Sequence, residues 1–264
     1  MYADTIEIIG KAAVAKSSFA KKYPFRYFLA ALLAGAFVGF GIVLIFSIGA
    51  PFAATSSPAV KLIMGASFGI ALTLVIMAGS ELFTGLNMIM IIGSMAKATR
   101  LFDLALVWIL SYLGNIVGSL GLSFLIAQAG MLKNPVFLKF VTDISSVKMH
   151  APLPDLFARG ILCNMLVCLA VWMCMRLKSE AAKMIAIFWC LFAFIASGFE
   201  HSIANMTLLS IPLMGPHDIS LISWSGYARN IAIVTLGNIV GGGIIIGGIY
   251  GFISLTPKTP EPTR

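Results

Sequence analysis

Charge is scarce in this sequence. Only 11% of its 264 residues are Asp, Glu, Lys or Arg, whereas about a quarter of the residues in soluble domains are charged. The net charge of +8 arises because 10 acidic residues stand against 18 basic ones, not from the dense basic clusters that bind nucleic acid. An ordinary soluble domain, a disordered chain and a nucleic-acid-binding protein are therefore excluded.

Residues that hold metals and cofactors are also few. The sequence has three histidines and four cysteines, and it contains neither an HExxH motif nor a CxxC pair. All four cysteines lie in apolar stretches, where a free thiol acts as a small apolar side chain. We therefore expect no metal, no cofactor and no enzymatic activity. The cysteines are Cys163, Cys168, Cys174 and Cys190.

Long uncharged runs fill most of the chain, and 59% of the residues are apolar. A membrane-spanning helix needs about 20 mostly apolar residues. Charge is costly in hydrocarbon, so the gaps between charges outline the spans. We predict an all-α membrane protein with six helices, at residues 27–49, 62–96, 101–129, 156–177, 184–214 and 227–254.

The sequence contains an internal duplication. Glu81 and Glu200 interrupt the second and fifth predicted spans and lie 119 positions apart, and the hexapeptide Leu-Gly-Asn-Ile-Val-Gly occurs at 113–118 and again at 236–241. Because each repeat holds three spans, the second must cross the membrane in the opposite direction. We predict an inverted 3+3 repeat, 27–129 and 156–255, with its working site near the midplane.

Short flanking segments complete the chain. We expect residues 1–26 to form an amphipathic segment on the cytoplasmic membrane surface and 256–264 to form a cytoplasmic tail. The segments 1–26, 97–100, 176–183 and 258–264 together carry twelve Lys and Arg residues, and the opposite side carries six. This bias predicts that both termini are cytoplasmic.

The second and fifth spans are too long for one simple crossing, and each has glycine beside its acid, in Gly79-Ser-Glu-Leu-Phe-Thr-Gly85 and Gly198-Phe-Glu-His-Ser202. These features predict interrupted helices, because non-helical backbone at membrane depth must line a cavity or be buried in protein. A break exposes helix N-termini, whose free N–H groups and positive dipole ends favour anions. The pattern therefore points to an anion-selective constriction.

The polar residues at the two breaks have alternative interpretations. Glu81 and Glu200 could contact a permeating ion, but a carboxylate at the start of a half-helix more often caps it, and we favour capping. His201 is either a hydrogen-bonded core histidine or a functional group, and its position beside an acid in a break favours function. Thr84 and Asn164 could equally serve the site or bond to backbone.

One further motif in the sequence suggests an unrelated function. Residues 65–69 read Gly-Ala-Ser-Phe-Gly, which matches the GxSxG elbow of serine hydrolases and, with His201, raises an intramembrane serine protease as a remote alternative. The elbow requires a strand-to-helix turn. Ser67 lies within a predicted helix, where small residues serve packing.

Three long motifs carry a resemblance over essentially the whole chain, at 79–85, at Gly160-Ile-Leu-Cys-Asn-Met-Leu-Val-Cys-Leu-Ala-Val-Trp172 and at Ala196-Ser-Gly-Phe-Glu-His-Ser-Ile-Ala-Asn-Met206. The sequence resembles the formate/nitrite transporter family. The resemblance implies a homopentamer in a prokaryotic inner membrane, with one pore per subunit in an aquaporin-like fold. Ser-Glu-Leu-Phe-Thr-Gly is similar to the nitrite and hydrosulfide branches, and Asn164 and His201 look closest to the hydrosulfide channels.

The same resemblance implies a permeation path. An outer constriction would contain Phe68 and Phe194, and an inner one Leu72, Leu82 and Val167, although by pattern alone these residues are ordinary helical core. The polar side chains of Thr84, Asn164 and His201 would surround the pocket between the two constrictions. Lys148 would be a vestibule cation that attracts anions, and Lys16, in the N-terminal helix, would be a candidate gating residue.

The expected function is passage of small monovalent anions of weak acids, foremost hydrosulfide or nitrite, with formate and chloride also conducted. Two mechanisms stay open. Neutral His201 could donate a hydrogen bond to the anion, or it could donate a proton so that the neutral acid crosses, which would avoid most of the cost of placing a charge at low dielectric. The second would make the protein a proton-coupled formate or nitrite transporter.

Overall fold

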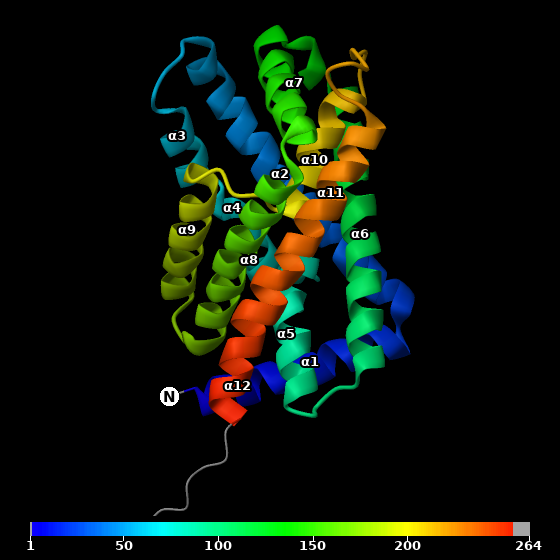
Figure 1. Cartoon of the computed structure of the whole chain (residues 1–264), viewed down its shortest axis with the longest axis vertical. Coiled ribbons are helices and arrows are strands. Elements are labelled where there is room, and N and C mark those ends of the chain that lie inside the picture. The colour runs from blue at the N-terminus through cyan, green and yellow to red at the C-terminus, as the bar shows by residue number, and fades with distance from the viewer. Residues whose placement is uncertain (1, 256–264) are drawn as a thin grey trace, which may run out of the picture.

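The computed structural model describes residues 2–255, and within that range the chain is all helical, with no β-strand (Figure 1). The predicted tail at 256–264 lies outside the described residues. The helices in chain order are α1 (Ala3–Lys22), α2 (Pro24–Ala54), α3 (Val60–Ser67), α4 (Gly69–Thr73), η1 (Leu74–Gly79), α5 (Phe83–Met95), α6 (Leu101–Gln128), η2 (Met131–Lys133), α7 (Pro135–His150), α8 (Leu153–Arg176), α9 (Glu180–Ala196), α10 (Ser202–Leu213), α11 (Trp224–Asn238), η3 (Ile239–Gly248) and α12 (Ile249–Leu255).

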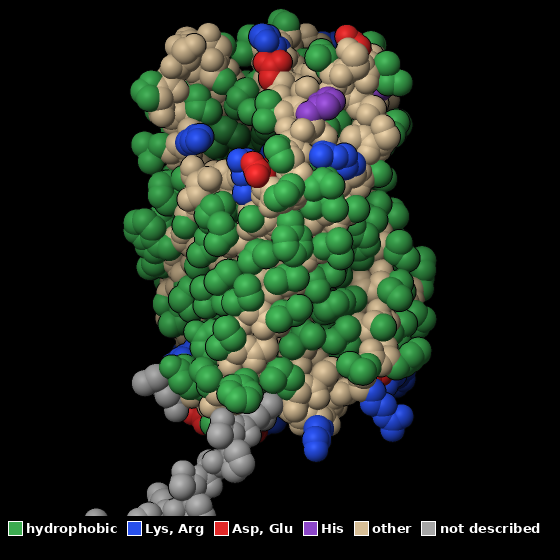
Figure 2. All heavy atoms as spheres, viewed as in Figure 1, with side chains coloured by type: hydrophobic (Ala, Val, Ile, Leu, Met, Phe, Trp, Pro, Cys, Tyr) green, Lys and Arg blue, Asp and Glu red, His purple; other side chains and the backbone are tan. Residues whose placement is uncertain are grey.

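The chain is a multi-pass membrane protein. Within residues 2–255, five helical stretches are long and apolar enough to cross a bilayer, and two shorter apolar helices, Phe83–Met95 and Ser202–Leu213, accompany them. On the face that Figure 2 shows, apolar side chains cover the middle of the molecule and the charged side chains gather toward its two ends. The long stretches are Pro24–Ala54, Val60–Gly79, Leu101–Gln128, Leu153–Arg176 and Trp224–Ser254.

Both predicted interruptions are present. The first helical stretch ends at Gly79 and resumes at Phe83, and the second ends at Ala196 and resumes at Ser202. Gly79 and Gly198 have φ values of +82° and +72°. Only glycine adopts this left-handed backbone readily, so each glycine turns the chain out of its helix just before the acid.

One helix was not predicted. Residues 135–150, which lie in the expected connection between the repeats, form α7 at the opposite end of the molecule from α1 (Figure 1). The side chain of Asn134 caps this helix by accepting from the amides of Val136 and Phe137. Phe137 and Val141 bury one face of the helix at a spacing of four. The Asn-Pro start and this spacing were readable in the sequence, but the low hydropathy concealed them.

Glycine brings two helix pairs into close contact. A Cβ atom added to Gly118 on α6 would overlap the backbone of Leu32 on α2, and one added to Gly241 on η3 would overlap the backbone of Ile161 on α8. Small residues at such spacing let helices approach closely in membranes. The two glycines therefore let α6 pack closely on α2 and η3 pack closely on α8.

The amphipathic helix α1 crosses one end of the bundle beneath α5 (Figure 1). An ion pair between Lys21 and Asp103 fastens its last turn to the start of α6. At the other end of α1, the ring of Tyr2 packs 5.8 Å from that of Tyr250 on α12. Both ends of α1 are therefore attached to the bundle.

Candidate functional site

Two cavities enter the bundle from opposite ends. The α1-side cavity has a volume of about 420 Å³ and is lined by Lys16, Glu81, Leu72 and Leu82, among others. The α7-side cavity has a volume of about 360 Å³, and its lining includes Lys148, Glu200, Phe194 and His201. Six of the residues expected along a permeation path therefore line one cavity or the other, whereas Phe68, Thr84, Asn164 and Val167 line neither.

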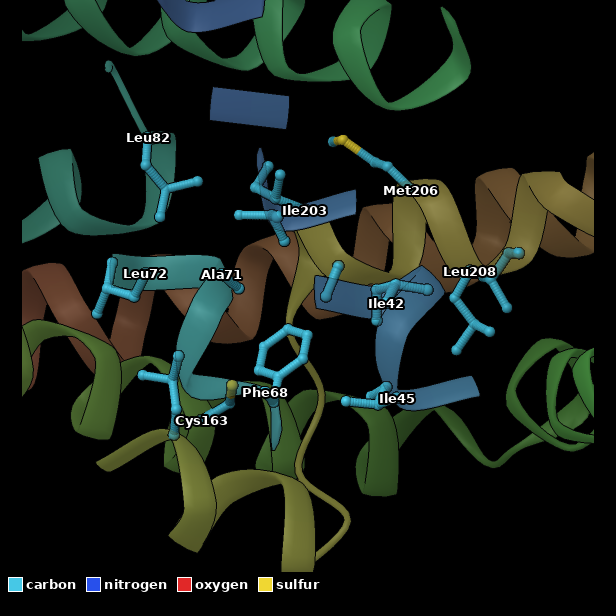
Figure 3. Close-up of a cluster of buried hydrophobic side chains, with 14 of the residues drawn as sticks. Ile42, Ile45, Phe68, Ala71, Leu72, Leu82, Cys163, Ile203, Met206 and Leu208 are labelled. Atoms are coloured by element: carbon cyan, nitrogen blue, oxygen red, sulfur yellow. The ribbon is translucent and has the colours of Figure 1, made fainter. Parts of the chain in front are cut away.

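A tightly packed apolar region separates the cavities. The rings of Phe68 and Phe194 meet edge to face with their centroids 5.5 Å apart. Phe68 and Val167 are each only 2% exposed. Figure 3 shows Phe68 in the middle of the buried cluster, with Leu72 and Leu82 toward one end. All five predicted constriction residues therefore lie in or beside this region: Phe68, Leu72, Leu82, Val167 and Phe194.

A polar pair lies within this apolar surrounding. The Oγ1 atom of Thr84 is 3.0 Å from Nε2 of His201, and both residues are buried. The ring of Phe194 stacks almost parallel to the imidazole, with the centroids 6.0 Å apart and the planes inclined by 17°. Because Thr84 and His201 are 117 positions apart, only the fold brings them together.

The starts of two half-helices meet at this pair. Thr84 is the second residue of α5, and His201 is the N-cap of α10, where its Nδ1 atom accepts a hydrogen bond of 3.1 Å from the amide of Ala204. The positive ends of both helix dipoles therefore lie at the Thr84–His201 contact. This arrangement favours negative charge at a place without a fixed cation.

Asn164 supports the site from the side. Its Nδ2 atom donates to the carbonyls of Thr84 (3.2 Å) and Asn238 (2.7 Å) and to the side-chain oxygen of Asn87 (3.0 Å). These acceptors belong to the protein, so the amide joins α5, α8 and α11 behind the polar pair. The same Thr84 carbonyl also accepts from the thiol of Cys168.

Two asparagines missed by sequence reasoning hold the breaks in place. Asn115 accepts from the amide of Phe83 (3.0 Å) and donates to the carbonyls of Ala31 (2.8 Å) and Glu81 (3.0 Å). Asn238 accepts from the amide of Ser202 (2.8 Å) and donates to the carbonyls of Gly160 (2.7 Å) and Glu200 (3.0 Å). We call these the asparagine clamps. Each asparagine is the third residue of the repeated hexapeptide, and this repetition was the sequence signal that could have identified the pair.

The prediction that the two glutamates cap the half-helices was wrong. The carboxylate of Glu81 bonds to Lys16 and to the hydroxyl of Tyr27. The N-cap residue of α5 is Leu82, which makes no side-chain capping bond. The carboxylate of Glu200 bonds instead to Lys148 and Asn205. The side chains that accept from the first amides of α5 and α10 are those of the asparagine clamps and His201, which leaves the carboxylates free to pair with lysines.

Two lysines therefore enter the site as partners of acids. Nζ of Lys16, on α1, lies 2.7 Å from the carboxylate of Glu81, and Nζ of Lys148, on α7, lies 2.7 Å from that of Glu200. Each ion pair lines one cavity. The helices that cover the two ends of the bundle are thus tied to the two breaks in the same way.

The serine hydrolase motif forms no elbow. Ser67 ends the helix α3, and its hydroxyl donates to the carbonyl of Ile63 at 2.9 Å. A helix continues on both sides of Ser67, and residues 2–255 contain no strand from which an elbow could turn. The motif is therefore part of helix packing.

Comparisons with known proteins agree with this arrangement. The family model described as formate/nitrite transporter matches residues 3–252. The chain is 42% identical to the nitrite transporter NirC of Escherichia coli (strain K12), over 99% of this chain and 95% of that protein. It is 32% identical to the formate channel FocA of Haemophilus influenzae, over 90% and 89%.

Solved structures are similar as well. A structure described as an FNT family ion channel superposes with a TM-score of 0.90 at 41% identity, covering 96% of this chain and 99% of that one. A pentameric formate channel with formate bound superposes with a TM-score of 0.75 at 29% identity, covering 90% and 100%. Members of this family are channels and transporters, not enzymes. The chain belongs to the formate/nitrite transporter family.

Proposed function

We propose that this protein conducts small monovalent anions of weak acids between the α1-side and α7-side cavities. The observation that carries the proposal is the contact of 3.0 Å between Thr84 and His201, at the meeting point of two helix N-termini and between the two cavities. The contact supplies polar groups and a positive potential where the surrounding side chains are apolar.

The apolar constriction limits which ions can pass. An ion entering between Phe68 and Phe194 must lose most of its water, which is costly for any charge. The helix dipoles and the Thr84–His201 pair offset part of that cost for an anion and raise it for a cation. The cost of losing water rises steeply with charge, so a monovalent anion loses less hydration free energy than a divalent anion of similar size.

Nitrite and formate are the substrates that the relatives favour, because the similar proteins include a nitrite transporter at 42% identity and a formate channel at 32%. Hydrosulfide is a further candidate substrate, because the motif Ser80-Glu81-Leu82-Phe83-Thr84-Gly85 is similar to that of the hydrosulfide branch of the family. Chloride is the fourth candidate substrate, because it is similar in size and charge to the other three anions. We place nitrite first, because the nitrite transporter matches nearly the whole chain.

We also infer a channel domain over residues 27–255, built from six spans in an inverted 3+3 repeat. Gly79 and Gly198, and likewise the two glutamates, lie 119 positions apart, and the asparagine clamps lie 123 apart. Equivalent bonds accompany them: the amide of Glu81 donates to the carbonyl of Ala30, and that of Glu200 to the carbonyl of Arg159. The similar pentameric formate channel supports a homopentamer.

The excess of Lys and Arg on the side of α1 supports a cytoplasmic location for that end of the bundle. The N-terminal segment 1–26 then lies on the inner surface, where Lys16 tethers α1 beside the cavity mouth and is a candidate gating residue. The bacterial relatives support location in a prokaryotic inner membrane. The α7-side cavity, with Lys148, would open to the outside.

Flux measurements test the proposal. The protein is reconstituted into liposomes, and uptake of nitrite, formate, hydrosulfide and chloride is compared with uptake by protein-free liposomes at several pH values. We expect uptake of all four, with nitrite fastest, and no uptake of sodium. A protein that conducts cations, or that carries none of these anions, contradicts the proposal.

A further inference from the structure

Two cations converge on one exposed ring where α1 turns into α2. Nζ of Lys22 lies 5.3 Å, and Cζ of Arg26 4.9 Å, from the ring centroid of Tyr23, and all three residues are exposed. Each contact is a cation–π interaction. Because a tyrosine ring carries no net charge, it brings the two cations together without neutralising them. We call these three residues the basic corner.

The basic corner keeps its positive charge. Within residues 2–255, neither Lys22 nor Arg26 forms an ion pair with an acid. The carboxylate of Asp103, at the start of α6, is already paired with Lys21. Two uncompensated cations on one side chain repel each other, and an anion placed between them would be bound by both. The other three lysines of α1 each have an acidic partner: Lys11, Lys16 and Lys21.

Packing holds the basic corner in place. The ion pair between Lys21 and Asp103 fastens the last turn of α1 to the first turn of α6. The ring of Phe19 packs edge to face on Tyr23, at 6.5 Å, and on the buried Tyr27, at 5.5 Å. Figure 1 shows α1 turning into α2 beside α6. A ligand at the corner therefore meets cations on a fixed backbone, which lowers the entropy cost of binding.

Apolar side chains lead from the basic corner into the membrane. The long apolar stretches Pro24–Ala54 and Leu101–Gln128 both begin beside the corner. On α2, Phe25, Leu29 and Leu33 are 70%, 42% and 46% exposed. Residues four apart lie on one face of a helix, so these three form an apolar stripe that starts next to the two cations. A ligand with an anionic head and apolar chains would match both parts of this surface.

We propose that the basic corner binds an anionic phospholipid of the leaflet on the α1 side. The phosphate diester lies against Lys22 and Arg26, and an acyl chain lies along Phe25, Leu29 and Leu33. Basic groups at the ends of membrane helices bind anionic headgroups in this way. A zwitterionic phospholipid fits less well, because its own ammonium group would lie beside two cations and the corner has no carboxylate to receive it. The site is independent of which anion the protein conducts.

Native mass spectrometry of the protein in detergent micelles measures the binding. Phosphatidylglycerol and phosphatidylcholine with identical acyl chains are titrated against the wild type and against the double variant Lys22→Gln/Arg26→Gln. Each basic residue beside an anionic lipid is worth about fivefold in affinity. In the tightest class of sites, we therefore expect the double variant to bind phosphatidylglycerol about 25-fold more weakly than the wild type does, and phosphatidylcholine equally well. Equal affinity of both proteins for phosphatidylglycerol overturns the proposal.

Two further variants distinguish a defined site from general attraction. Lys11→Gln/Lys178→Gln removes two exposed cations from the same end of the molecule, since Lys178 follows the end of α8 whose Met175 lines the α1-side cavity. This control should bind phosphatidylglycerol as the wild type does. Lys22→Arg/Arg26→Lys exchanges the two cations and should retain the affinity. A loss in the Lys11/Lys178 control as large as that in Lys22→Gln/Arg26→Gln would show non-specific attraction and overturn the proposal.

The melting temperature in the same micelles separates binding from folding. A lipid that binds the folded state raises the melting temperature. Without lipid, Lys22→Gln/Arg26→Gln should melt with the wild type, because both side chains are exposed, and phosphatidylglycerol should then stabilise only the wild type. A variant that melts lower even without lipid would show that the cations serve the fold, and an equal gain from the lipid would place it elsewhere; either result overturns the proposal.

Other occupants of the corner give different results in the same experiments. Excess inorganic phosphate should leave phosphatidylglycerol bound, because the acyl chain contributes to binding, whereas complete displacement would show a site for free phosphate. The mass spectra also count subunits. We expect Lys22→Gln/Arg26→Gln to keep the oligomeric state of the wild type, and dissociation would assign the corner to a contact with a second copy of the chain. Displacement or dissociation overturns the lipid assignment.

Discussion

Removal of an asparagine clamp is the perturbation whose size the structure predicts best. Asn238→Ala deletes three hydrogen bonds, of 2.8, 2.7 and 3.0 Å, and leaves the amide of Ser202 and the carbonyl of Glu200 without this partner. A side-chain hydrogen bond inside a membrane protein is worth about 0.6 kcal/mol on average, and one in a soluble protein about 1 kcal/mol. We therefore expect Asn238→Ala to lower the free energy of unfolding by about 2 to 3 kcal/mol.

The other clamp is the internal comparison. Asn115→Ala deletes bonds of 3.0, 2.8 and 3.0 Å to the equivalent groups, so the loss should match that of Asn238→Ala within about 1 kcal/mol. Asn134→Ala serves as the control, because it removes only the exposed cap of α7 and should cost about 1 kcal/mol. Denaturant titration in detergent micelles measures all three. Wild-type stability of either clamp variant would refute the clamp, and a large difference between them would refute their equivalence.

The remaining predictions concern the breaks and the cavity charges. Gly79→Ala and Gly198→Ala should each lower the free energy of unfolding by about 1 to 2 kcal/mol, because both glycines have positive φ; unchanged micelle titrations would contradict this. Lys148→Gln leaves the 3%-exposed carboxylate of Glu200 without its cation and should cost about 3 kcal/mol or more, whereas the double variant with Glu200→Gln should recover most of that loss. Lys61→Gln removes a cation from the α7-side cavity and should slow uptake severalfold at low salt but not at high salt, because salt screens steering; a salt-independent effect would argue against steering.

The positions of the breaks were predictable because their cause is local. Gly79 and Gly198 sit beside the acids, and a left-handed glycine ends a helix wherever it occurs. The contact between Thr84 and His201 was not predictable from the residues alone, because it depends on how two segments 117 positions apart are folded against each other.

The misassigned glutamates show the same limit. Next to a helix start, a carboxylate normally accepts from free amides, but Lys16 on α1 and Lys148 on α7 pair with Glu81 and Glu200 instead. Helix α7 itself was missed, so Lys148 had no predicted acidic partner. The repeated hexapeptide was recognised as a duplication, yet its asparagines gained a role only once Ala31 and Gly160 lay within bonding distance.

Sided blocking of uptake tests most directly whether the two cavities belong to one anion path. Ser80→Cys places a thiol in the α1-side cavity and Ile195→Cys one in the α7-side cavity, while the four native cysteines are buried. We predict that a membrane-impermeant thiol reagent stops nitrite uptake from the cytoplasmic side for Ser80→Cys and from the outer side for Ile195→Cys, with no effect on Thr55→Cys at the exposed end of α2. Undiminished uptake after complete labelling of both cavity variants would contradict a path between Thr84 and His201.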